Sequence, residues 1–152
     1  MALVAPIKNR RDSTSPGNPR DSLLGIPVKN TSDMIQRVRV GFGFAALLRF
    51  EKMSGLPKHG IADVLQIPPR TLARRRASGR LSPQESERLL RLAALFQKAV
   101  VLFEGDVERA RAWFTRPVRA LGYEEPLNYA KTELGAREVE HVIGRLEHGV
   151  FT

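Results

Sequence analysis

The sequence predicts an all-α protein, a helical bundle that contains a helix-turn-helix and continues into a small helical domain. Three observations support this fold class. Apolar residues recur at helical spacing from residue 31 onwards, helix start and stop signals alternate along that region, and no stretch alternates between apolar and polar residues as a half-buried strand does. A length of 152 residues suits one main core.

The charge of the chain is basic and unevenly distributed. The formal net charge is +9, and the isoelectric point is near 10.8. Residues 1–103 carry 18 Lys and Arg against 7 Asp and Glu, whereas residues 104–152 carry 7 against 9. Such asymmetry is typical of a chain in which one half binds nucleic acid or a membrane surface. We therefore expect a different kind of partner for the second half.

Several classes of protein are disfavoured by composition. Without cysteine there is no disulfide framework, no thiolate nucleophile and no Cys-based zinc site. The N-terminal segment MALVAPIKNRR places its charges after a short apolar stretch, the reverse of a secretory signal. The longest apolar run, residues 92–103, is interrupted by Gln97 and Lys98 and is shorter than the roughly 20 residues that a bilayer requires. We expect a cytoplasmic protein with no membrane partner.

The elements follow from local signals, taken in chain order. Residues 1–31 are rich in proline, glycine and polar residues, which predicts a flexible basic N-terminal arm. Ser32 or Asp33 can cap a first helix, and Gly41 and Gly43 mark the joint to an apolar segment that ends at Ser54-Gly55.

Two short helices come next. Pro57 suits the first turn of a helix over residues 58–65, Pro68-Pro69 break the chain and start another over residues 70–77, and Gly79 ends it. This pair has the proportions of a helix-turn-helix.

A long helix begins at Ser82-Pro83-Gln84-Glu85, where Ser82 is the expected N-cap and Glu85 completes a capping box. Its stretch over residues 89–103 is apolar almost all round, so we expect it to be covered by several neighbours or by a second subunit. We take residues 32–103 as the helix-turn-helix and dimerisation region.

Residues 104–152 form the second domain. Asp106 can cap a helix through Trp113-Phe114, Pro117 and Pro126 can each begin a short turn of helix, and Thr132 can cap a final helix with Gly149 as its stop. Trp113-Phe114 is interpreted as a core anchor.

The arginine-rich second helix of the helix-turn-helix is the candidate nucleic-acid site. Such a unit lays its second helix in the major groove, with N-terminal residues toward the bases. Arginine bonds a guanine edge or a phosphate, and flanking basic residues hold the backbone. The DNA-binding candidates are Lys58, Arg70, Thr71, Arg74, Arg75 and Arg80. The alternative is that this run is only a solvated face. Two departures from the usual turn, Gln66 in place of glycine and Pro68 in place of a capping Ser or Thr, suggest a slightly reshaped turn.

Nothing in the sequence indicates catalysis. His59, His141 and His148 are scattered, and the acidic pairs near residues 124 and 138 are typical of surface charge. We expect no enzymatic activity, no metal and no cofactor.

Four segments carry a resemblance to a known family: RTLARRR, GRLSPQESERLLRLA, AWFTRPVRALGYEEPLNYA and GAREVEHVIGRLEHGVF. Together they resemble antitoxins of the Xre/MbcA/ParS type, over about residues 34–151. The resemblance implies an Xre-like helix-turn-helix followed by a toxin-binding domain over residues 104–152.

The resemblance also implies partners. They are a cognate RES-domain toxin that consumes NAD and whose active site the antitoxin occludes, operator DNA bound as an autorepressor, and a second copy of the chain in a homodimer within a larger toxin-antitoxin complex. By position, the toxin-binding candidates are Arg137, Glu140, Arg145, Glu147, His148, Gly149, Val150 and Phe151.

Two rival functions stay open on sequence alone. One is a stand-alone helix-turn-helix transcriptional regulator whose C-terminal domain only dimerises. The other is a pure interaction protein whose helix-turn-helix has become structural.

Overall fold

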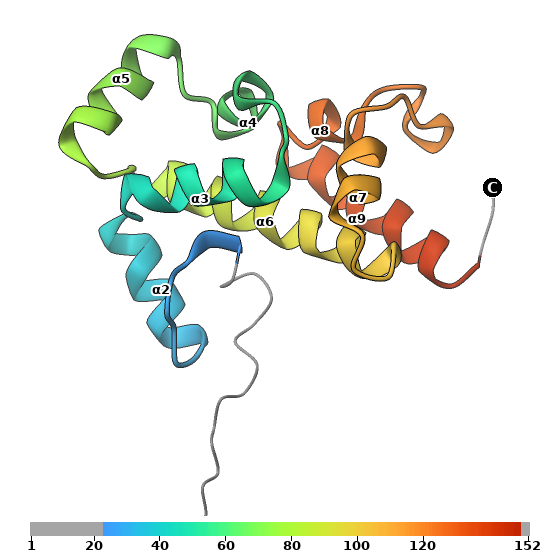
Figure 1. Ribbon diagram of the computed structural model, residues 1–152, viewed down its shortest axis with the longest axis horizontal. Helices are drawn as coiled ribbons and strands as arrows, with labels where there is room; N and C mark the ends of the chain where they lie inside the picture. The colour runs from blue at the N-terminus through green and yellow to red at the C-terminus, as the bar shows by residue number, and fades with distance from the viewer. Residues whose placement is uncertain (1–22, 150–152) are drawn as a thin grey trace, which may run out of the picture.

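The computed structural model describes residues 23–149, and this part of the chain is built from helices (Figure 1). In chain order they are α2 (Thr31–Val40), α3 (Phe44–Ser54), α4 (Lys58–Leu65), α5 (Pro69–Ser78), α6 (Pro83–Leu102), α7 (Val107–Phe114), the 3-10 helix η1 (Arg119–Leu121), α8 (Pro126–Tyr129) and α9 (Glu133–Glu147). Within residues 23–149 the only β pairing is two isolated bridges, Gly43 with Arg80 and Val118 with Glu124. The all-α fold class is confirmed.

Helix α6 is the centre of the fold. It packs against α2, α3, α4, α7 and α9, and Figure 1 shows it running along the long axis with the other helices arranged around it. Its start is as expected: the Ser82 side chain accepts a hydrogen bond from the Glu85 backbone N–H, and the Glu85 carboxylate accepts one from the Ser82 N–H, which completes the capping box. Leu89, Ala93 and Phe96 are completely buried. Neighbouring helices therefore cover much of the apolar surface of this helix.

The first helix starts differently from the expectation. Asn30, and neither Ser32 nor Asp33, is the N-cap of α2, and its side chain accepts a hydrogen bond from the Asp33 N–H at 2.9 Å. All these residue types can cap a helix, so the sequence alone could not choose among them. Leu23 and Leu24, which fall inside the predicted arm, are buried in the core. Residues 1–22 lie outside the described residues, so the flexible arm stays a prediction.

Local signals of the second half are mostly confirmed. Asp106 caps α7 and Thr132 caps α9, each accepting a backbone hydrogen bond from three residues further along. Pro126 is the first residue of α8, whereas the turn expected at Pro117 begins later, at Arg119. Helix α9 ends at Glu147.

The core runs from one half of the chain to the other without interruption. Phe50 of α3, Phe96 of α6 and Phe114 of α7 are fully buried, with ring centroids 6.0 Å and 5.6 Å apart in that order. On α9 the buried residues Val139, Val142 and Ile143 face α6, as their helical spacing predicts. Phe114 is the expected core anchor, whereas Trp113 is only partly buried. No helix of the described part is both long and apolar enough to cross a membrane.

Candidate functional site

The α4–turn–α5 unit has the geometry of a helix-turn-helix. Gln66 ends α4 with φ 57° and ψ 43°, the left-handed conformation that glycine usually supplies. The Ile67 N–H still donates to the Ala62 carbonyl at 3.0 Å. Pro68 precedes α5 in an extended conformation and makes no side-chain cap. Gln66 therefore adopts the left-handed backbone conformation of the turn itself, although it is not glycine.

Helix α5 stands apart from the rest of the molecule, at the end opposite the C-terminus of α9 (Figure 1), and none of its residues is buried. Three contacts on its inner side hold it. Leu72 is partly buried against the core, the Arg75 Nε donates to both Glu85 oxygens at 2.9 and 3.1 Å, and the Arg76 guanidinium lies 5.2 Å above the centre of the Phe44 ring.

The opposite side of α5 is the exposed side. At 100° per residue, Arg70 and Arg74 lie about half a turn away from Leu72, and the small residues Ala73 and Ala77 lie beside them. All four outer residues are exposed. Small side chains between two arginines let this face approach another surface closely. The outer face of α5 is the candidate nucleic-acid interface.

The six DNA-binding candidates are thus not equivalent. Lys58, Arg70 and Arg74 are exposed, and Thr71 is half-buried and accepts a hydrogen bond from Arg74 Nη2 at 3.3 Å. The other two are already engaged within the protein: Arg75 with Glu85, and Arg80, whose Nη1 donates to the Gly41 carbonyl at 2.9 Å.

Sequence reasoning missed the structural role of Arg75 because its partner is ten residues away on another helix. It also left out Arg76, which is exposed on the same helix.

Two carboxylates under this interface have shifted pKa values. Burial raises the pKa of Glu85, but hydrogen bonds from Arg75 and the Ser82 N–H, with the Arg75 charge, outweigh it and hold the pKa below the ordinary 4.5. Burial raises the pKa of Glu51 above that value, and the positive charges of Lys58 and Arg76 only partly oppose this. Glu51 therefore places negative charge among the basic residues of the helix-turn-helix.

The predicted toxin-binding residues lie on α9 and at its C-terminal end. Arg137 is exposed and donates to Glu133 at 2.7 Å, Glu140 forms an ion pair with Lys98 of α6, and Arg145 is half-buried. Glu147, His148 and Gly149 are exposed where the helix ends. Val150 and Phe151 lie outside the described residues. Leu134 of α9, 76% exposed, was missed, although its helical spacing from Val139, Val142 and Ile143 would have placed it off the buried face.

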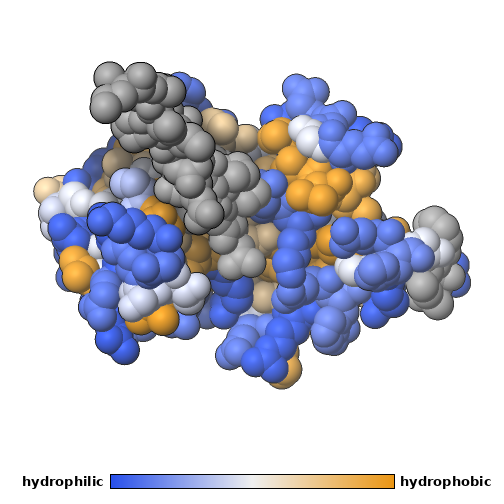
Figure 2. Space-filling model, turned by 90° about the horizontal axis from the view of Figure 1, so that it is seen from below, coloured by the Kyte–Doolittle hydropathy of each residue, from blue (hydrophilic) through white to orange (hydrophobic). Residues whose placement is uncertain are grey.

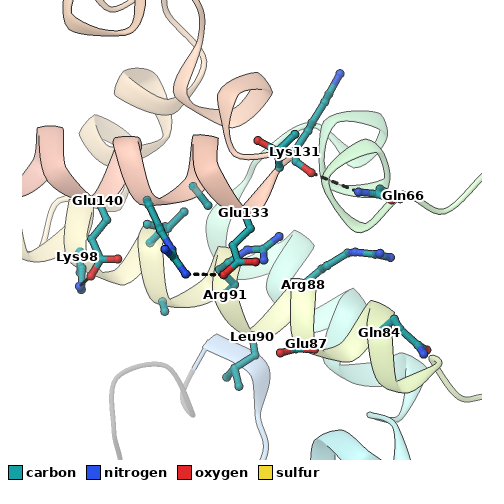
Figure 3. A pocket seen from close by; sticks show the side chains of 15 residues that line it. Gln66, Gln84, Glu87, Arg88, Leu90, Arg91, Lys98, Lys131, Glu133 and Glu140 are labelled. Carbon is teal, nitrogen blue, oxygen red and sulfur yellow. Dashed lines mark hydrogen bonds and ion pairs between the residues drawn. The ribbon is translucent and has the colours of Figure 1, made fainter.

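A groove of about 780 Å³ lies between α6 and α9. Figure 3 shows Glu133 and Glu140 on the α9 side and Arg88, Arg91 and Lys98 on the α6 side. Glu133 pairs with Arg137 of the same helix, and Glu140 pairs with Lys98 of α6. The groove therefore carries charges of both signs, and the Lys98–Glu140 pair spans it.

The groove also contains a link between the two halves of the chain. At its upper end Gln66 Nε2 donates to the Lys131 carbonyl at 3.4 Å (Figure 3), and the Lys131 ammonium lies 3.9 Å from the Asp63 carboxylate. The turn of the helix-turn-helix thus contacts the segment that leads into α9.

Apolar side chains are exposed at several places on the surface, and Figure 2 shows a patch of them between polar groups on the face seen from below. Over residues 23–149 the exposed large hydrophobic side chains are Ile35, Val40, Leu48, Met53, Val101, Tyr123 and Leu134. In the same part of the chain no group of three or more His, Asp or Glu residues is placed to hold a metal ion.

Two family models match consecutive parts of the chain. Residues 33–94 match the Antitoxin Xre-like helix-turn-helix domain, and residues 98–149 match the Antitoxin Xre/MbcA/ParS C-terminal toxin-binding domain. The class of protein is thus an antitoxin with an N-terminal helix-turn-helix and a C-terminal toxin-binding domain. Helix α6 spans both matched regions: most of it lies in the helix-turn-helix match, and its last turn lies in the match to the toxin-binding domain.

Curated relatives identify the family. The chain is 38% identical over 130 residues to Antitoxin Xre of Yersinia enterocolitica, covering 85% of this chain and 88% of that protein. It is 32% identical over 136 residues to Antitoxin Xre of Photorhabdus laumondii, covering 89% and 92%. A third Antitoxin Xre, from Pseudomonas putida, is 29% identical over 133 residues, covering 84% and 80%. The chain belongs to the Xre antitoxin family, and the resemblance seen in the sequence is confirmed.

Proposed function

We propose that this protein is the antitoxin of a type II toxin-antitoxin system that neutralises a cognate RES-domain, NAD-degrading toxin by occluding the toxin's active site, and that it represses its own operon by binding operator DNA. One observation carries the proposal: α5, which carries the exposed Arg70 and Arg74, and the C-terminal end of α9 in the toxin-binding domain lie at opposite ends of the described part of the chain (Figure 1). The protein acts by binding and not as an enzyme. Its site of action is the cytoplasm, where operator DNA and NAD are found.

At the DNA end, Arg70, Thr71 and Arg74 contact the major groove in this proposal, and Lys58 contacts a phosphate. Arg75 holds the helix in place through Glu85. Replacing both Arg70 and Arg74 with Ala should weaken operator binding by about tenfold or more, because each lost base contact costs about 1–3 kcal/mol. The control is Arg119→Ala, an exposed arginine in the second domain. Equal loss in the control would mean that only net charge matters.

At the toxin end, the exposed terminus of α9 with Glu147, His148 and Gly149 leads toward the active site, and Val150 and Phe151 follow in sequence. Arg137, Glu140 and Arg145 lie further back on the same helix.

The proposal includes a homodimer. The open face of α6 presents Leu90, Ala94, Gln97 and Val101 at alternating spacings of four and three, the pattern of a helix-helix seam. Val101 is 55% exposed on it. Sedimentation of Val101→Glu should show monomer where the parent chain shows dimer.

The decisive experiment expresses the adjacent reading frame alone and then together with this protein, and follows growth and cellular NAD. If NAD and growth collapse alone and recover together, the proposal stands. If the neighbour is harmless or is not rescued, a stand-alone helix-turn-helix regulator becomes the better account, and operator binding without a toxin partner is its signature.

A further inference from the structure

The loop from Val118 to Glu124, hereafter the 118–124 loop, has an unusual backbone. Two consecutive residues, Gly122 and Tyr123, are left-handed, each with φ 65°. Glycine adopts this conformation without strain, but for an aromatic residue it is uncommon and costs of the order of 1 kcal/mol. Gly122 alone already ends η1. The left-handed tyrosine that follows is therefore not required to stop the helix.

Tyr123 gains little packing in return for this strain, because 68% of its surface is exposed. Folding alone would favour glycine or asparagine here, since these residues tolerate left-handed backbone best. Strained backbone that the surrounding structure holds in place occurs mainly at binding and active sites.

The loop is fixed in place by its own backbone. The Tyr123 N–H donates to the Val118 carbonyl at 3.0 Å, and the Val118 N–H donates to the Glu124 carbonyl at 3.1 Å. Leu121 is buried, and η1 packs against α9. The Glu124 carboxylate also accepts a hydrogen bond from Asn128 Nδ2 at 2.9 Å. The ring of Tyr123 is thus carried by a closed loop that is anchored in the core.

The surroundings of the ring suit a protein partner. Exposed residues of both signs flank it in the chain, including Arg119, Glu124 and Glu125. An aromatic residue within a polar rim is the common form of an interface anchor. Nucleic acid is disfavoured, because this loop lies at the end of the molecule away from α5 (Figure 1), and its 3-10 helix packs against α9. It also lies inside the part of the chain that matches a toxin-binding domain.

We propose that Tyr123 is a second anchor for the toxin, separate from the C-terminal end of α9, and that the 118–124 loop presents its ring to an apolar recess on the toxin surface beside the active-site entrance. This inference rests on the proposed function. It makes toxin binding bipartite: the end of α9 blocks the entrance, and Tyr123 supplies affinity from one side.

The test measures binding of the purified toxin from the adjacent reading frame to the full antitoxin chain by calorimetry, together with the melting temperature of each free antitoxin variant. Tyr123→Gly and Tyr123→Asn remove the ring and relieve the backbone strain. Toxin affinity should fall about tenfold or more while the melting temperature stays equal or rises. Tyr123→Phe keeps the ring and should bind within threefold of the parent.

The matched control is Glu104→Gly. Glu104 is also exposed, also left-handed at φ 56° and also in the second domain. Its replacement should leave toxin affinity unchanged.

Parental affinity in both Tyr123→Gly and Tyr123→Asn would overturn the inference, and so would a lowered melting temperature in both, because the ring would then support the fold. If the parent chain itself does not bind the toxin, the proposed function fails first and the inference fails with it.

Discussion

Replacing Glu85 with Gln should release α5 from the body of the protein. The Glu85 side chain is 8% exposed and Arg75 is 32% exposed, and the guanidinium of Arg75 donates to both carboxylate oxygens. Because α5 has no buried residue, this pair, Leu72 and the Arg76–Phe44 contact are what hold it. A selective effect on α5 is therefore expected.

The free energy that α5 loses in Glu85→Gln depends on which hydrogen bonds the Gln side chain can keep. A hydrogen bond to a charged group contributes about 1.5–3 kcal/mol, and Gln keeps one acceptor oxygen for Arg75 or for the Ser82 N–H. Because Arg75 is partly exposed, solvent weakens its ion pair, and we expect the free energy of opening α5 to fall by about 1–2 kcal/mol. That change corresponds to roughly a 5- to 30-fold faster hydrogen exchange of α5 amides.

Operator binding separates two explanations of the same variant. If only charge mattered, removing a negative charge near the DNA end would strengthen binding. If Glu85 acts by positioning α5 through Arg75, binding weakens, and this is the result that we expect.

The assay is native-state hydrogen exchange combined with operator titration. The control is Glu87→Gln, an exposed carboxylate two residues further along α6. The reasoning is refuted if α5 protection matches that of the control, or if protection falls evenly over all helices.

Four further outcomes are expected. Glu51→Gln should strengthen operator binding a few-fold in filter binding, because it removes a negative charge that lies among Lys58 and Arg76; an unchanged affinity would place Glu51 away from the DNA. The ionised Glu85 carboxylate contributes to the free energy of unfolding in full above its unfolded pKa of about 4.5, and this contribution is lost as pH falls through the lower folded pKa. The urea midpoints of the parent and Glu85→Gln should therefore converge below that pH. Gly135→Ala should lower the melting temperature, because a Cβ there would lie 1.8 Å from the Tyr129 carbonyl oxygen, whereas Gly144→Ala on the same helix meets nothing within 4 Å and should raise it. Because the proposed DNA and toxin interfaces, on α5 and at the end of α9, lie at opposite ends of the described structure (Figure 1), toxin-loaded antitoxin should still shift the operator fragment in a gel, and displacement of DNA by toxin would contradict that geometry.

Much of the fold could be predicted because its signals are local. The caps Ser82, Asp106 and Thr132 act within three residues of themselves, and the buried face of α9 follows from spacing alone. Asn30 was missed because neighbouring residues offered equivalent capping chemistry.

The site was less accessible to sequence reasoning because its key contacts join different elements. The Arg75–Glu85 pair depends on how α5 and α6 lie against each other, so the sequence showed only an arginine run. Likewise, nothing in the letters GYEE indicates that the tyrosine is left-handed and exposed.

The structure places the basic helix α5 and the mixed-charge second half of the sequence toward two different ends of its described part (Figure 1). A DNA-binding end needs a positive surface, whereas a protein-binding end needs complementary patches of both signs. Helix α6 connects these ends: Glu85 in its first turn holds α5, and Lys98 in its last turns pairs with Glu140 of α9. Gln66 and Lys131 join the two halves a second time, beside the same groove. The position of the α5 face relative to the end of α9 is therefore set by α6, by the Gln66–Lys131 link and by the continuous core. In the proposed function, this arrangement holds the two partners apart.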